Sequence, residues 1–259
     1  MAKKNCRVRD RRDPREQRSK NRNYQTPDRD TANRWDRVER NFRKAPTLKA
    51  KNRLQAQYIE AMESTPITIA TGYPGSGKTY LAGRMAGAWL KERRVDTIIL
   101  ARPAVSTSES LGFFKGTIEE KMQGWLAPVM GALKDEFSPG ELSYLIKETI
   151  DRLVFVPLEV IKGYSWKNSF IIVDEVEDCT LKELRSIVTR IGVNSRLVLS
   201  GDISQTDLAS SGVAELLTMR KHDNALARHI AHINFNDPST IVRSDTCREM
   251  ILAFERAGK

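Results

Sequence analysis

The sequence predicts an α/β fold, with a mostly parallel sheet and helices on both of its faces. Three observations predict it. After residue 66, short apolar runs of strand length alternate with longer stretches of helical periodicity. Several of these runs are almost continuously apolar, as is typical of parallel strands that helices cover on both sides. A glycine-rich turn also joins the first apolar run to the helical stretch that follows it.

The expected elements can be given by residue number. Strands are expected at 67–70, 97–101, 153–156, 170–173, 197–200 and 232–235. Helices are expected at 49–62, 78–92, 118–137, 140–151, 181–191, 213–222 and 246–256. With 259 residues, of which 40% are hydrophobic, the chain can bury a substantial core.

The first 46 residues differ from the rest in charge. Basic residues outnumber acidic ones by more than two to one in 1–46, and this extension carries almost all of the net charge of +10. With few apolar residues, it should be flexible on its own. It is either a solubilising extension or an arm that binds RNA or single-stranded DNA, with Tyr24, Trp35 and Phe42 available to stack on bases. We favour the nucleic-acid arm, followed by one domain over 47–259.

Three features that the sequence lacks indicate the expected compartment and whether a membrane-spanning helix is expected. No run of about 18 uncharged apolar residues is present, so we expect no membrane-spanning helix. The first twenty residues lack the apolar stretch of a secretory signal. Cys6, Cys179 and Cys247 are far apart and fit neither a disulfide framework nor a zinc site. These features favour a cytoplasmic protein, and we assign Cys179 to packing.

Residues 72–79 (GYPGSGKT) match the pattern G-x-x-x-x-G-K-[ST] between an expected strand and an expected helix. Glycines let successive backbone N–H groups point at phosphate oxygens, and the helix N-terminus adds positive potential there. The Lys78 ammonium is expected to neutralise the β- and γ-phosphates, and the Thr79 hydroxyl to ligate magnesium. The residues expected to contact the nucleotide here are Gly72, Tyr73, Pro74, Gly75, Ser76, Gly77, Lys78, Thr79 and Tyr80.

Two carboxylates end the apolar run at 170–173, where an open parallel sheet places its ligands. We expect Asp174 to hold magnesium and Glu175 to orient and deprotonate the attacking water. A kinase for a small molecule is an alternative, since it would use the same loop. The second carboxylate favours hydrolysis of a nucleoside triphosphate.

A third polar turn follows the run at 197–200 and carries Asp202 and Gln205. An amide can donate to a γ-phosphate and accept from a water molecule, so we expect Gln205 to report whether the γ-phosphate is present. A plain polar turn at a strand end is the alternative.

With these motifs in order, residues 47–259 resemble the PhoH-like proteins, a family similar to the first motor domain of superfamily 1 helicases, and specifically a compact phage or bacterial form. The further matching stretches are 51–58, 102–105, 109–116, 120–121, 241–244 and 251–255. The resemblance implies a single RecA-like P-loop domain that binds and hydrolyses ATP with Mg²⁺. It also implies association with RNA or single-stranded DNA, helicase-like activity, and a homo-oligomeric ring such as a hexamer.

The resemblance also implies roles for residues outside the three motifs. Gln55 would pair with the adenine edge, and Tyr58 would pack beside the base; otherwise they are an exposed residue and a helix-packing aromatic. Arg243 would complete a neighbouring subunit's site in trans, because the chain has no second motor domain; otherwise it is a surface charge. Arg102 after its strand either belongs to the family motif or binds a helix C-terminus.

One position departs from the family pattern. The family usually has Gln two residues after the catalytic Glu, whereas this chain has Glu177. We therefore expect hydrolysis to survive, because Asp174 and Glu175 are intact, and we expect coupling of hydrolysis to strand movement to be affected. A nucleotide-gated nucleic-acid-binding protein without strand-separating activity is the alternative function.

Overall fold

The computed structural model describes residues 44–257 except for 104–125, 148–149 and 207–210. Most of the basic extension lies outside the described residues, as do the stretches 109–116 and 120–121. Among the described residues, no helix is both long and apolar enough to cross a membrane.

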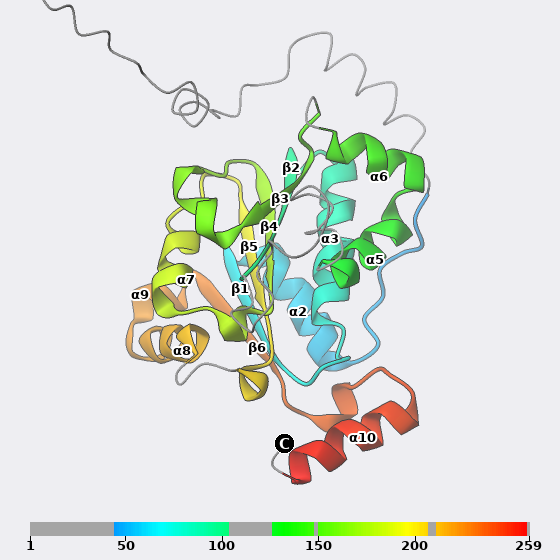
Figure 1. Ribbon diagram of the computed structural model, residues 1–259, viewed down its shortest axis with the longest axis vertical. Coiled ribbons are helices and arrows are strands. Elements are labelled where there is room, and N and C mark those ends of the chain that lie inside the picture. Colours follow the sequence, from blue (N-terminus) through cyan, green and yellow to red (C-terminus); the bar gives the residue numbers. More distant parts are fainter. Residues whose placement is uncertain (1–43, 104–125, 148–149, 207–210, 258–259) are drawn as a thin grey trace, which may run out of the picture.

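Six parallel strands form one sheet, in the order β3-β2-β4-β5-β1-β6 (Figure 1). All neighbouring pairs are parallel, as the apolar runs predict. The strands are β1 (Ile67–Gly72), β2 (Thr97–Arg102), β3 (Leu153–Pro157), β4 (Ser169–Asp174), β5 (Arg196–Ser200) and β6 (Ile230–Phe235).

Helices cover both faces of this sheet (Figure 1). One face carries α2 (Arg53–Ser64), α3 (Lys78–Lys91), α5 (Ala127–Glu136) and α6 (Pro139–Ile146). The other carries α7 (Leu181–Val188), α8 (Gly212–His222) and α9 (Asn224–Ala227). Alternate strand residues feed the two cores: Ile98 and Ile172 pack with α3, whereas Ile99 and Ile171 pack with α7 and α8. The predicted fold class is therefore confirmed.

The short connections carry 3₁₀ turns that the periodicity did not predict. They are η1 (Leu158–Gly163), η2 (Val176–Asp178), η3 (Ile203–Gln205) and η4 (Pro238–Thr240). Two of them, η2 and η3, directly follow β4 and β5. They lie at the carboxyl edge of the sheet, where the functional site forms.

Some predicted helix boundaries are wrong. The first described helix begins at Arg53 rather than at 49, because the Asn52 side chain caps it by accepting from the Gln55 N–H. The helix expected over 140–151 ends at Ile146, and the chain then reaches Asp151 with a φ of 54°, which no α-helix continues through. Residues 118–125 of another expected helix lie outside the described residues.

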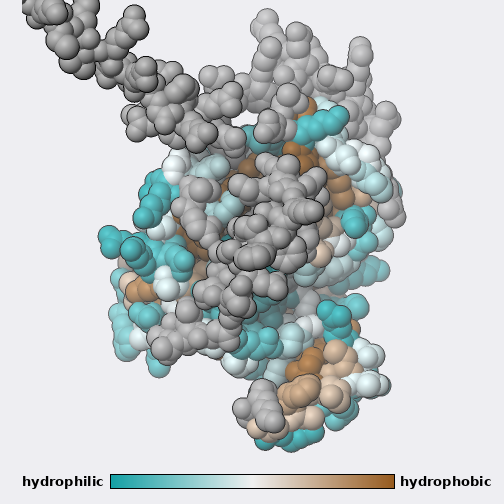
Figure 2. Space-filling model, in the orientation of Figure 1, coloured by the Kyte–Doolittle hydropathy of each residue, from teal (hydrophilic) through white to brown (hydrophobic). Residues whose placement is uncertain are grey.

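The last helix, α10 (Asp245–Arg256), lies away from the sheet (Figure 1). It buries none of its side chains, and Met250 and Phe254 are about half exposed. Figure 2 shows this apolar surface on the C-terminal segment. Two hydrogen bonds join the segment to the loop after β1: the Val242 N–H donates to the Gly75 carbonyl (3.0 Å), and the Tyr73 hydroxyl donates to the Glu255 carboxylate.

Candidate functional site: a phosphate loop and strand-end carboxylates

The loop after β1 has the backbone that its glycines allow. Gly72, Gly75 and Gly77 all have positive φ, at 112°, 76° and 92°. Residues with a side chain rarely adopt this conformation. A Cβ at Gly72 would also lie 2.5 Å from the carbonyl carbon of Phe235, so the close approach of β6 requires glycine there. The loop ends at Gly77, the N-cap of α3, so the helix N-terminus points at its centre.

Lys78 is folded back against this loop and is only 8% exposed. Its ammonium donates to the Gly72 carbonyl (2.5 Å) and the Tyr73 carbonyl (2.9 Å). Burial lowers the pKa of Lys78, and the facing carboxylates of Asp202 and Glu177 oppose that shift. The loop carbonyls therefore hold the Lys78 ammonium against the loop.

Thr79 and Asp174 meet beside the loop because β1 and β4 both neighbour β5. Ser200, the last residue of β5, is level with Ala70 in one neighbour and with Asp174 in the other. The Thr79 hydroxyl donates to Asp174 Oδ1 (2.9 Å) and lies 3.3 Å from the Ser200 hydroxyl. Burial raises the pKa of Asp174, and the hydrogen bond from Thr79 opposes that rise.

These oxygens are suited to magnesium. Hydroxyl and carboxylate oxygens are its preferred ligands, and Mg²⁺ is usually held by one or two protein groups together with substrate phosphates. Among the described residues, no group of three or more His, Cys, Asp or Glu side chains forms a metal site. The pair Thr79 and Asp174 therefore fits an ion that arrives with a nucleotide better than an ion held by protein alone.

Glu175 follows β4 in a left-handed conformation, with a φ of 56°. Such a conformation costs a non-glycine residue on the order of 1–3 kcal/mol, and it recurs at active sites and ligand clamps, where the surrounding structure holds it in place. It turns the carboxylate to the edge of the cleft, where Arg102 Nη2 lies 3.3 Å from Glu175 Oε1. Arg102 at the end of β2 therefore pairs with the residue expected to act as the base.

The turn after β5 forms the opposite wall of the site. Asp202 is buried, and its Oδ1 accepts from the Ser204 N–H (3.2 Å) and hydroxyl (2.7 Å), while its Oδ2 has no partner among the described residues. Gln205 ends η3 with an exposed side chain that lines the cleft. This position exposes the Gln205 amide at the cleft, and its expected contact with a γ-phosphate stays a prediction.

Gln55 of α2 reaches the cleft from the other side. The side chain is 3% exposed, its amide donates to the Ser76 carbonyl (2.9 Å), and its Oε1 accepts from the Lys51 N–H (2.8 Å). A carboxamide has two donor hydrogens and two acceptor lone pairs. One of each is left for a base, so adenine pairing by Gln55 stays a prediction.

The prediction that Tyr58 packs beside the base is wrong. Tyr58 is fully buried and packs edge-on against Phe235, with ring centroids 5.7 Å apart. It follows Gln55 by three residues on α2, but the helix turns this side chain into the core under the sheet. Its alternative, a helix-packing aromatic, is what the structure has.

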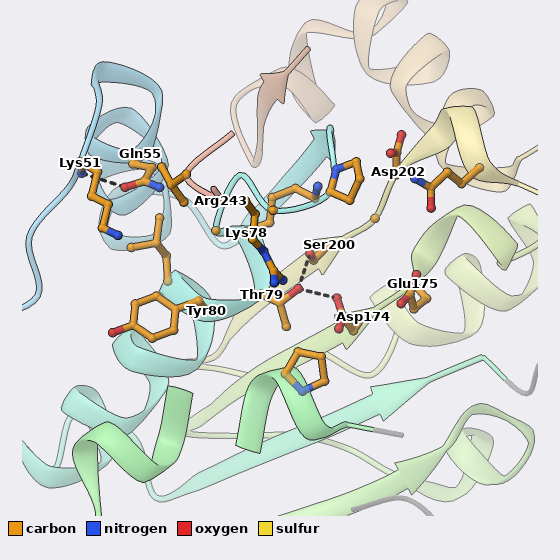
Figure 3. Close-up of a pocket in the computed structure, with 18 of the residues that line it drawn as sticks. Lys51, Gln55, Lys78, Thr79, Tyr80, Asp174, Glu175, Ser200, Asp202 and Arg243 are labelled. Atoms are coloured by element: carbon orange, nitrogen blue, oxygen red, sulfur yellow. Dashed lines mark hydrogen bonds between the residues drawn. The ribbon is translucent and has the colours of Figure 1, made fainter. Parts of the chain in front are cut away.

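Arg243 lies against the phosphate loop of its own chain. A Cβ at Gly75 would be 2.5 Å from Arg243 Cγ, and the backbone bond from Val242 to Gly75 holds the two segments together. Figure 3 shows Arg243 between Gln55 and Lys78. The long separation in sequence between Arg243 and its own loop therefore does not separate them in space.

All of these segments border one cleft of about 490 Å³ (Figure 3). Its lining includes most of the predicted site residues: Gln55, Pro74, Gly75, Gly77, Lys78, Thr79, Tyr80, Asp174, Glu175, Gln205 and Arg243. Gly72, Tyr73 and Ser76 belong to the loop but are not among the lining residues. Tyr80 is 41% exposed, and its hydroxyl donates to Asp135 (2.9 Å).

Sequence reasoning did not single out several lining residues. Lys49 adds positive charge beside Gln55, as does Lys51 of the stretch 51–58 that resembles the family, and Ser200 places a hydroxyl beside Thr79. The position of Ser200 at the end of an apolar run was a usable signal, because strand ends meet at the same edge of a parallel sheet. Lys49 had no comparable signal, since exposed lysines are common.

Comparison with known proteins identifies related proteins and their family. A family model described as PhoH-like protein matches residues 47–255. The chain is 33% identical over 218 residues to a PhoH-like protein of Synechocystis sp., covering 83% of this chain and 64% of that relative. It is 30% identical over 220 residues to protein PhoH of Escherichia coli strain K12, covering 84% of this chain and 61% of that relative. The chain therefore spans about three fifths of the length of these relatives.

A solved structure agrees in fold. The large terminase of a thermophilic bacteriophage superposes with a TM-score of 0.51 at 11% identity, over 78% of this chain and 50% of that one. At this identity the likeness concerns the fold, and it confirms the expected RecA-like P-loop architecture. The family model covers most of the chain, and both relatives align along more than four fifths of it. The resemblance stated from the motifs is thus confirmed, and the chain belongs to the PhoH-like protein family.

Proposed function

We propose that this domain hydrolyses ATP with Mg²⁺ and acts together with RNA or single-stranded DNA in the cytoplasm. The observation that carries the proposal is the meeting of Lys78, Thr79 and Asp174 in one cleft, with Glu175 at its edge. A loop and helix N-terminus that present N–H groups and a lysine suit the phosphates. A carboxylate just beyond the magnesium ligands suits the activation of water.

Each residue of the site has a separate role in the proposed reaction. Lys78 would leave the loop carbonyls for the β- and γ-phosphate oxygens, while Thr79 and Asp174 hold Mg²⁺, which neutralises phosphate charge when bound. Glu175 would accept a proton from the water that attacks the γ-phosphorus. The bond to the β,γ-bridging oxygen breaks, and ADP and inorganic phosphate leave. Gln205 would contact the γ-phosphate and the water from the far wall.

Arg243 has a role in this proposal that differs from the one expected from the resemblance. Its side chain lies over its own loop, which supports an action in cis on the nucleotide of the same chain. The homo-oligomeric ring, such as a hexamer, remains a separate proposal. The exposed Met250 and Phe254 of α10 support it, because a second copy would cover apolar surface that this chain leaves open.

The proposal of a nucleic-acid partner rests on the charge of the N-terminal extension. The excess of basic residues in 1–46 gives the chain an extension suited to phosphate backbones. Whether hydrolysis separates strands is a finer question, and Glu177 in place of an amide favours the second candidate, a nucleotide-gated binding protein. Strand-displacement assays with and without ATP distinguish a motor from such a gated binder.

The decisive test is phosphate release from ATP and Mg²⁺ by the purified chain and by Lys78→Ala. Removing a preorganised cation from the phosphate site should slow turnover by roughly 10²-fold or more. Lys182→Ala is the matched control, because Lys182 is exposed on α7 away from the cleft. Single-stranded RNA or DNA should accelerate the unmutated chain. Equal rates for Lys78→Ala and Lys182→Ala would refute the proposed function.

A further inference from the structure

Tyr80 is a large aromatic residue whose side chain is left partly open inside the candidate site. It is 41% exposed, and it is the one aromatic residue among the described residues that line the cleft. It lies in the first turn of α3, directly after Thr79. The sequence predicts only that Tyr80 contacts the nucleotide, and the proposed mechanism does not use it. Tyr58, the aromatic residue expected beside the base, is fully buried in the core.

The protein already engages the hydroxyl of Tyr80. This hydroxyl donates to Asp135 Oδ2 (2.9 Å) and accepts from Arg84 Nη1 (2.8 Å). A phenol has a single hydrogen to donate, so none is left for a phosphate oxygen. Arg84 is itself buried, and its Nε donates to Glu136 Oε1 (2.8 Å). The hydroxyl end of Tyr80 is therefore fixed to α5, and the part of the side chain that a ligand can use is the ring.

The ring lies at the end of the cleft where the base of a nucleotide would be. Figure 3 shows Tyr80 and Gln55 at one end of the cleft, and Asp174 and Glu175 at the other. Lys78 lies between the two ends. Under the proposed function, magnesium and the attacking water lie at the carboxylate end, so the nucleoside extends toward the end with Tyr80.

An aromatic ring at this end contributes something that hydrogen bonds cannot. The Gln55 carboxamide can reach only an edge of a base, because hydrogen bonds lie in the plane of the base. The faces of the base are flat and apolar, and they stack on aromatic side chains. A tyrosine used only for packing, such as Tyr58, leaves no ring surface open to a ligand. The open ring of Tyr80 in the cleft is therefore suited to the face of a base.

We propose that the base of the bound nucleotide stacks on the Tyr80 ring, which Asp135 and Arg84 hold in place through its hydroxyl. The ligand of this subsite is the planar base of a nucleoside phosphate, and both purines suit it, because every base has a face that can stack. Tyr80 thereby takes the place that the resemblance gives to Tyr58. The inference rests on the proposed function, since it needs a nucleotide in the cleft, but it does not need hydrolysis.

The first test is titration calorimetry of the full chain with Mg²⁺ and ADP, GDP or inorganic tripolyphosphate, which has no base. Tyr80→Ala should bind ADP and GDP roughly 10-fold more weakly, because one stack between base and ring is lost. It should bind tripolyphosphate as tightly as the unmutated chain does. Tyr80→Phe keeps the ring and should bind ADP within about 3-fold, since the lost hydrogen bonds only position the ring. Met219→Ala is the control, because Met219 is exposed on α8 and does not line the cleft.

The second test is spectroscopic and uses Tyr80→Trp. An indole also stacks on bases, so the fluorescence of this added tryptophan should fall when ADP binds. Tripolyphosphate should leave the fluorescence unchanged, because it brings no base to the ring. The unmutated chain, titrated in the same way, gives the signal of the native tryptophans to be subtracted. Damage to the fold would not produce a response to ADP alone.

Equal ADP affinities of Tyr80→Ala and the unmutated chain would overturn the stack. Equal losses for ADP and tripolyphosphate would also overturn it, since Tyr80 would then support the start of α3 rather than the base. A loss confined to ADP would contradict stacking, which GDP shares. If the unmutated chain binds none of the three probes, the proposed function fails together with the inference. If ADP binding depends on Tyr80 but ATP is not hydrolysed, the proposed function fails and the base subsite stands.

Discussion

The two flanks of the cleft are built differently. On the phosphate flank, Lys78 and Asp174 are 8% and 5% exposed. Asp174 ends β4, whose register with β5 the sheet fixes, and Lys78 begins α3 directly after the glycine loop that follows β1. On the other flank, Gln55 comes from α2, and the exposed Arg243 comes from a segment whose last helix buries no side chain. Under the proposed function, the sheet would position the groups that carry out hydrolysis, whereas segments outside it would adjust how the nucleotide is held.

The two flanks also differ in how firmly the surrounding structure holds their backbone. Glu175 keeps a left-handed backbone at the end of β4 because the surrounding strands and turns determine its position. The segment around Arg243 depends on a few contacts, chiefly the bond from Val242 to Gly75 and the hydrogen bond between Tyr73 and Glu255. Substitutions on the phosphate flank should therefore lower turnover more than those on the other flank.

The largest effect is expected for Glu175→Gln. The amide keeps the size of the side chain but accepts no proton from water, and loss of a general base costs up to roughly 10⁴-fold. Magnesium and nucleotide binding should persist, because Thr79 and Asp174 are unchanged. The measurement is single-turnover hydrolysis together with the ATP retained after gel filtration, with Glu215→Gln as the exposed control. A variant that no longer retains ATP would show that Glu175 binds rather than acts as the base.

Arg243→Ala should have an intermediate effect. An arginine that neutralises transferring phosphate is worth roughly 10³-fold when fully engaged, and we expect closer to 10²-fold here because the side chain is exposed. ATP affinity should change little. Arg248→Ala is the matched control, since Arg248 pairs with Asp245 on α10 away from the loop.

Mixing two variants separates the cis role from the trans role of Arg243. Lys78→Ala carries an intact Arg243, and Arg243→Ala carries an intact phosphate site. If Arg243 serves its own chain, the mixture should stay inactive after subunit exchange has been demonstrated by labelled subunits. Restored turnover would instead assign the arginine to a neighbouring subunit and support the ring.

The phosphate flank could be predicted from the sequence because its residues are contiguous or end strands. Gly72, Gly75 and Gly77 determine the conformation of the loop locally, and Asp174 ends an apolar run. Both features can be predicted from the local sequence without knowledge of the tertiary fold. The contact of Arg243 with Gly75 could not be foreseen, because it depends on where β6 returns beside β1. The prediction for Tyr58 fails for the same reason, since helical periodicity does not say which face of α2 packs against the sheet.

The smallest effect is expected for Gln55→Ala, and it tests whether the second flank reads the base. The Gln55 carboxamide uses one N–H donor for the Ser76 carbonyl and one acceptor lone pair for the Lys51 N–H. One donor and one acceptor therefore remain for adenine. A hydrogen bond of this kind contributes about 1 kcal/mol, so the preference for ATP over GTP should fall by roughly 5-fold. Gln57→Ala on the same helix is the control, since Gln57 does not line the cleft. An equal loss for ATP and GTP would mean that Gln55 only braces the Ser76 carbonyl of the loop, and that base selection lies with other residues of that flank.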